Sequence, residues 1–135
     1  MRPRLLVLSI TFAIACSSGT EPDLETCTGP VTMTATAGLT PTFAWSPRCA
    51  GGFLLVQRIG DNQNMWLVGV PPIQDQDTML PNTLAPKIRY GTKPDGIRQN
   101  GPALPLVAGT AYGAYLEIHG PHAGVGILGT ITFTP

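Results

Sequence analysis

The two histidines of the chain have the residue type and the spacing that could bind a metal ion. They lie three residues apart in the segment His119-Gly120-Pro121-His122. The Gly-Pro pair between them predicts a turn, and a zinc site normally needs three or four protein ligands. No third ligand lies close in the sequence, so we expect no bound metal. We expect His119 and His122 to be exposed on a loop that could contact a binding partner.

Acidic and hydroxyl side chains form no recognisable reaction centre. Asp75 and Asp77 are one residue apart, but their segment lacks the carboxylate series and the distal glutamate of an EF-hand calcium loop. No serine can be matched with a histidine, and the hydrolase, zinc-protease and P-loop motifs are absent from the sequence. We therefore expect a non-catalytic protein without a cofactor. An enzyme site that only the fold assembles, from Glu117 with Asp95 or His119, is an alternative.

Two aromatic residues could instead bind a ligand by stacking. Tyr115 points away from the expected core, and Trp66 lies on a strand whose facing is ambiguous. Exposed aromatic rings can stack on sugars or fill a pocket in a partner protein. For Trp66, burial at the edge of the core is the preferred interpretation, because large apolar residues are mostly buried.

The first 16 residues have the organisation of an export signal that ends at a cysteine. Arg2 and Arg4 give a positive start, residues 5–15 are mostly apolar, and small residues precede Cys16. This apolar stretch is too short to span a bilayer, which takes about 20 residues. Its end, at residues 13–16, resembles the lipobox of bacterial lipoproteins, in which the cysteine is acylated and becomes the first mature residue. The resemblance implies a signal peptide over residues 1–15, lipidation of Cys16 and a membrane as partner.

The same resemblance implies a location in the bacterial cell envelope. Ser17 follows the cysteine where an aspartate would favour the inner membrane, so the outer membrane is expected if the organism has one. Residues 16–26 are mostly polar and lack an apolar period, which is typical of a flexible tether. The mature chain has eight acidic and six basic residues. Without a basic excess, nucleic acid is not expected as a partner.

Cys27 and Cys49 remain after the anchor, and an even pair in an oxidising compartment predicts a disulfide. A hairpin that turns at Gly38 gives an independent argument. It would place Val31 opposite Trp45 and Met33 opposite Phe43, with apolar residues on one face. The same register would bring the two cysteines opposite each other.

Short alternating segments separated by turn residues predict an all-β fold. Each segment has apolar residues at every second position or forms a mostly apolar run of strand length. Prolines at positions 81 and 86 restrict residues 80–84 to a sheet edge. The expected strands are residues 31–37, 42–46, 53–59, 65–70, 87–90, 112–118 and 130–134.

Two patterns resemble those of fibronectin type III domains. Phe-x-Trp-x-Pro at residues 43–47 is similar to their second strand, in which a tryptophan anchors the core. The spacing from Leu106 to Tyr112 resembles the tyrosine corner of immunoglobulin-like sandwiches, in which the hydroxyl bonds to backbone just upstream. The resemblance implies an antiparallel immunoglobulin-like or fibronectin type III-like β-sandwich of about seven strands over residues 27–135. Residues 71–105 depart from the pattern.

These observations together predict a lipid-anchored β-sandwich that binds or supports an unidentified protein partner at the cell envelope. A carbohydrate-binding surface lipoprotein that uses Tyr115 or Trp66 is the alternative. The motifs found in the sequence bear on fold and location and do not select a ligand.

Overall fold

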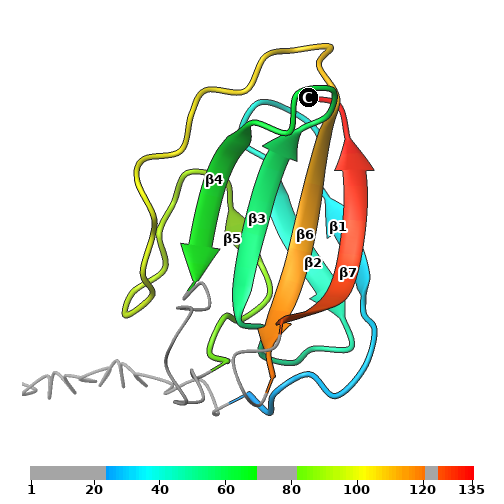
Figure 1. Cartoon of the computed structure of the whole chain (residues 1–135), viewed down its shortest axis with the longest axis vertical. Helices are drawn as coiled ribbons and strands as arrows, with labels where there is room; N and C mark the ends of the chain where they lie inside the picture. Colours follow the sequence, from blue (N-terminus) through cyan, green and yellow to red (C-terminus); the bar gives the residue numbers. More distant parts are fainter. Residues whose placement is uncertain (1–23, 70–81, 121–124) are drawn as a thin grey trace, which may run out of the picture.

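A computed structural model describes residues 24–69, 82–120 and 125–135, and these residues form seven β-strands in two antiparallel sheets (Figure 1). The predictions for the signal peptide, Cys16, most of the tether, Asp75, Asp77 and His122 lie outside the described residues. No helix in the described part is long and apolar enough to cross a membrane.

The strands divide into a sheet of three and a sheet of four. The smaller sheet has the order β1-β2-β5 and the larger has the order β4-β3-β6-β7. Figure 1 shows the larger sheet lying in front of the smaller one. The expectation of an all-β fold with about seven antiparallel strands is therefore confirmed. The strand bounds are β1 Thr32–Ala35, β2 Thr42–Ser46, β3 Phe53–Arg58, β4 Asn64–Gly69, β5 Ile88–Arg89, β6 Tyr112–His119 and β7 Val125–Phe133.

The predicted strands agree with the observed ones except near glycine and proline. β7 begins at Val125 rather than at residue 130, and it pairs along all of β6. The sequence did not predict the first part of β7 because its glycines are unfavourable in strands. The segment at 80–84 contributes only a single bridge among its described residues. There Leu84 and Gly51 exchange two backbone hydrogen bonds of 2.9 Å.

The core lies between the two sheets and is built around aromatic side chains. Phe43 of β2 meets Phe133 of β7 edge to face, with ring centroids 5.4 Å apart. Trp66 of β4 meets Tyr90 in the same manner at 5.2 Å. These contacts join the smaller sheet and its flanking turn to the larger sheet, and edge-to-face packing is a favoured geometry for aromatic pairs.

The tyrosine corner expected at Tyr112 is confirmed. Tyr112 is fully buried, and its hydroxyl oxygen accepts a hydrogen bond of 3.0 Å from the backbone N–H of Val107. The ring also stacks on Phe133, with centroids 5.7 Å apart. A buried phenol needs a polar partner, and this hydrogen bond fixes the loop that precedes β6 against the core.

The hairpin register predicted from Gly38 is wrong by two residues. In the structure Met33 pairs with Trp45 and Ala35 pairs with Phe43. The turn is displaced because Thr36 pairs with Thr42 at its mouth. The Thr36 N–H donates a hydrogen bond of 3.1 Å to the Thr42 carbonyl. The Thr36 hydroxyl in turn accepts a hydrogen bond of 2.8 Å from the Thr42 N–H. A shift of two preserves the facing of every side chain, so the apolar pattern could not detect it.

The disulfide between Cys27 and Cys49 is nevertheless present, with a Cα–Cα distance of 4.9 Å. It lies beyond the β1–β2 ladder and depends on a different pairing. Thr26 forms a parallel bridge with Ala50, whose carbonyl accepts from the Cys27 N–H at 3.0 Å. The disulfide prediction is confirmed, whereas the register argument offered for it is not.

Tyr90 connects the turn after β5 to the long segment that follows it. Its hydroxyl lies 2.7 Å from the carbonyl oxygen of Leu104 and 3.2 Å from that of Met65. Burial, with a smaller contribution from nearby Tyr112, raises the pKa of Tyr90 to about 12.

This raised pKa predicts a loss of stability in alkali. The unfolded chain releases the Tyr90 proton near pH 10, whereas the folded protein retains it until about pH 12. The unfolded state therefore binds fewer protons in this interval, and the free energy of unfolding should fall as pH rises through it. Urea unfolding from pH 8 to pH 12 tests this against Tyr90→Phe, which should show a shallower decline. An equally steep decline in the variant would assign the effect to other groups.

Candidate functional site

His119 is not on an exposed loop as the sequence suggested. It ends β6, is only 4% exposed, and its ring lies 5.4 Å from that of Phe53 in a tilted arrangement. The prediction failed because β6 extends one residue further than expected and Phe53 of the neighbouring strand packs against the ring. His119 is therefore part of the packed structure and is not a surface contact.

Asn82 holds the end of β6 at this point. Its side-chain oxygen accepts from the His119 N–H at 2.8 Å, and its side-chain amide donates to the His119 carbonyl at 3.1 Å. The amide thus provides both bonds that a paired strand would supply. A Cβ on Gly52 would lie 2.7 Å from Asn82 Oδ1 and from His119 Cδ2, so only glycine fits beside this pair. Sequence reasoning missed Asn82, because the two partners are 37 residues apart.

Trp66 is 2% exposed and belongs to the core, so the alternative in which it stacks on a ligand is wrong. Trp66 and Val68 both point into the core from β4. Trp66 pairs across the sheet with Val56, which is fully buried on the same face. The preferred interpretation, burial, is confirmed. Its indole Nε1 has no hydrogen-bond partner within the described part of the chain.

Tyr115 is half-buried on the outward face of the larger sheet. Its neighbours Ala114 and Leu116 are fully buried, so Tyr115 points away from the core. Leu55 is its register partner on β3, and Leu67 is the partner of Leu55 on β4. All three side chains are half-buried, and residues opposed in neighbouring strands lie about 4.5–5.5 Å apart. We call this row, Leu67-Leu55-Tyr115, the outer-face row.

The ring of Tyr115 lies along the sheet over Gly113. A Cβ at Gly113 would be 2.7 Å from the Tyr115 hydroxyl oxygen and 3.0 Å from Cε2 of the ring. Glycine at this position therefore permits the ring to lie low on the sheet. On the adjacent strand β7, Ile127 is 63% exposed and pairs with Glu117. The outward face thus presents apolar surface at these positions.

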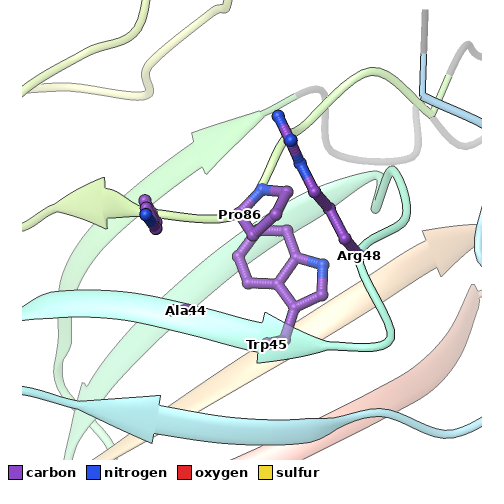
Figure 2. Close-up of a pocket in the computed structure, with 5 residues that line it drawn as sticks. Ala44, Trp45, Arg48 and Pro86 are labelled. Atoms are coloured by element: carbon purple, nitrogen blue, oxygen red, sulfur yellow. The ribbon is translucent and has the colours of Figure 1, made fainter. Parts of the chain in front are cut away.

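A pocket of about 550 Å³ lies beside the smaller sheet, and sequence reasoning did not predict it. We call it the Trp45 pocket. Its lining residues are Ala44 and Trp45 of β2, Arg48, and the Pro86-Lys87 pair that precedes β5. Figure 2 shows Pro86 and the side chain of Arg48 beside the Trp45 indole. A cation follows a proline both at Pro47-Arg48, where β2 ends, and at Pro86-Lys87, and this repeated pair is the one sequence signal of the pocket.

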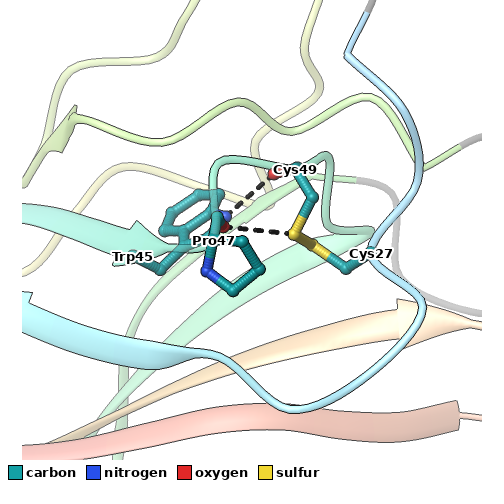
Figure 3. Close-up of a disulfide and its surroundings, with 4 residues drawn as sticks. All are labelled: Cys27, Trp45, Pro47 and Cys49. Carbon is teal, nitrogen blue, oxygen red and sulfur yellow. Dashed lines mark hydrogen bonds between the residues drawn. A yellow bond between two sulfur atoms is a disulfide. The ribbon is translucent and has the colours of Figure 1, made fainter.

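The disulfide end of the domain positions Trp45. The indole N–H donates to the Cys49 carbonyl at 2.9 Å, and the ring is 5% exposed (Figure 3). Cys49 Sγ lies 3.3 Å from the Pro47 carbonyl oxygen. This is a contact and not a hydrogen bond, because a disulfide sulfur has no proton to donate. The loop from residue 47 to 49 is thereby fixed between the indole and Cys27, with Arg48 within it.

Two acidic side chains of the described residues, Asp61 and Glu117, have shifted pKa values. Arg58 and Asp61 form an exposed ion pair at the end of β3, which holds the Asp61 pKa near 2. Glu117 is half-buried on the outward face of β6, and this burial raises its pKa. The described part of the chain contains no group of three His, Cys, Asp or Glu side chains that could hold a metal ion.

Comparison with models of known protein families, with curated protein sequences and with solved structures gave no significant match to this chain. Its functional interpretation therefore depends on its own residues.

Proposed function

We propose that this chain is a lipid-anchored, non-catalytic binding module of a bacterial cell envelope, built on a fibronectin type III-like sandwich. The outer-face row is the observation that carries the binding role. Leu67, Leu55 and Tyr115 are opposed on three neighbouring strands, and each keeps part of its side chain accessible to solvent. Tyrosine is enriched at the centre of protein interfaces, and the two leucines beside it add apolar area.

Strand order and the tyrosine corner support the proposed fold class. Sheets β1-β2-β5 and β4-β3-β6-β7 are compatible with an immunoglobulin-like sandwich, in which hairpins alternate between two sheets. The hydrogen bond from Val107 N–H to the Tyr112 hydroxyl adds a second feature that such sandwiches share.

The position of Cys27 at one end of the sandwich supports the proposed attachment. Cys27, the eleventh residue after the proposed acylated Cys16, is fixed to Cys49 at one end of the sandwich. The outer-face row lies along the side of the larger sheet and stays accessible to a partner when that end is held near a membrane. Ser17 after the cysteine favours the outer membrane in a two-membrane organism.

Site-specific crosslinking in native envelopes tests the binding role. A photo-crosslinking residue at Tyr115 of the full lipidated chain should give a saturable adduct with one protein. The same residue at Thr32 on β1, an exposed position of the other sheet, is the matched control. Leu55→Glu should abolish the adduct, because it introduces a charge into the centre of the row.

Two results would contradict the proposal in different ways. Equal adducts from positions 115 and 32 would show that the outward face is not the binding surface. Binding of the unmodified protein to glycans, lost on Tyr115→Ala, would favour the carbohydrate-binding alternative, since a low-lying tyrosine ring can also stack on a sugar.

A further inference from the structure

We propose that the Trp45 pocket, with Arg48 and Lys87 at its rim, binds the phosphate headgroup of anionic phospholipids and so holds the disulfide end of the domain against the bilayer. This inference deepens the proposed function and rests on it, because it requires the lipid anchor at Cys16.

The distribution of charge is the first observation in its favour. The described segments 26–50 and 82–94, which contain β1, β2 and β5, include no aspartate or glutamate, and they are flanked by Glu25, whose carbonyl accepts from the Ala50 N–H, and by Asp95. They carry four cations, whereas the mature chain as a whole has more acidic than basic residues. Four of the six basic residues that follow Cys16 therefore lie on the smaller sheet and its loops, at Arg48, Lys87, Arg89 and Lys93.

The chemistry of the pocket is the second observation. The guanidinium of arginine matches two phosphate oxygens, and lysine adds a point charge. Trp45, Pro86 and Ala44 supply apolar walls that suit the glycerol and upper acyl region of a phospholipid. The volume of about 550 Å³ lies within the range of small-molecule sites. Lys87 has a φ of 71°, a left-handed conformation that a non-glycine residue adopts only when its surroundings impose it.

The distance from the anchor is the third observation. Cys27 is bonded to Cys49, which directly follows Arg48. The chain from Cys16 to Cys27 spans at most about 40 Å when fully extended, so this end of the domain cannot lie further than that from the acylated cysteine. Charge interactions are screened beyond about 8 Å at physiological salt. A tether of this length allows the pocket to approach within that distance, and each cation that does so should strengthen association about fivefold.

Lysine labelling of the full lipidated protein in vesicles tests the contact. The chain contains two lysines, Lys87 at the pocket and Lys93 beyond β5, and both are exposed in the structure. Vesicles of phosphatidylcholine with or without phosphatidylglycerol are floated first to establish that the protein is anchored. An amine-reactive reagent is then added, and the two sites are quantified by peptide mass spectrometry. Labelling of Lys87 relative to Lys93 should fall at least fivefold with phosphatidylglycerol and recover at high salt.

Two charge variants make the test specific. Arg48→Gln should remove most of the protection of Lys87. Arg58→Gln removes the same charge at the opposite end of β3, where it pairs with Asp61, and should leave the protection intact. Loss of protection in both variants would indicate a general charge effect and overturn the pocket assignment.

The remaining outcomes separate this inference from the proposed function. Protein that floats but shows equal Lys87 labelling in both lipids overturns the headgroup contact and leaves the anchor in place. Protein that does not float overturns the anchor and the contact together. Protection by peptidoglycan fragments in neutral vesicles, without protection by phosphatidylglycerol, overturns the lipid contact and assigns the pocket to an anionic glycan.

Discussion

Trp66→Ala is expected to lower the free energy of unfolding by about 3–5 kcal/mol, the range for removing a large buried aromatic side chain. Trp66 is the largest of the fully buried side chains, and its ring meets Tyr90 edge to face. Domains of this size have only about 5–15 kcal/mol of stability. The variant should therefore be largely unfolded or melt far below the unmodified protein.

A matched comparison isolates the role of the indole N–H. Trp66→Phe and Trp45→Phe make the same change at two buried tryptophans. The Trp66 N–H has no partner within the described residues, whereas the Trp45 N–H donates to the Cys49 carbonyl. Trp45→Phe also removes a hydrogen bond worth about 0.5–1.5 kcal/mol, whereas Trp66→Phe removes an unsatisfied donor. Chemical denaturation should therefore find Trp66→Phe to be the milder variant. The reverse order would mean that Trp66 has a partner that this account lacks.

Removal of the disulfide should cost about 3 kcal/mol, the chain-entropy value for a loop of this size. The bond joins Cys27 to Cys49 across a separation of 22 residues. The double variant Cys27→Ala/Cys49→Ala should melt at a temperature well below the unmodified protein. A reductant should lower the melting temperature of the unmodified protein and leave the variant unchanged. If both proteins respond alike, the cysteines are not paired in the native protein.

The double variant should also loosen the Trp45 pocket. Arg48 lies between Trp45 and Cys49, and the Cys49 carbonyl accepts the indole hydrogen bond. Without the disulfide, the loop keeps this bond but loses its covalent link to residue 27. Hydrogen exchange at residues 48–50 should accelerate more than exchange in β6, which lies in the middle of the larger sheet.

Local sequence patterns predicted the features that local physics determines. Alternation located β2 and β6, and a continuous apolar run located β3, each to within a residue, because their inward positions are occupied by apolar side chains. The tyrosine corner could be predicted because Tyr112 and Val107 are only five residues apart. The disulfide could be predicted from parity and compartment without knowledge of the fold.

Long-range contacts explain what the sequence did not predict. The Asn82 side chain makes the hydrogen bonds that a neighbouring strand would make with His119. No sequence pattern around either residue predicts this contact. The Trp45 pocket requires β5 to pair with β2, which brings Pro86-Lys87 beside Arg48. The hairpin register failed because period-two alternation is unchanged by a shift of two residues.

We propose that an acylated cysteine holds this sandwich at a membrane. The intact mass of the mature protein from native envelopes tests this anchor most directly. We expect an N-terminus at Cys16 and a mass that exceeds the polypeptide by two or three acyl chains, because one chain alone anchors only marginally. Cys16→Ser should abolish this added mass. A mature protein that begins before Cys16, or one that carries no acyl group, would contradict the account.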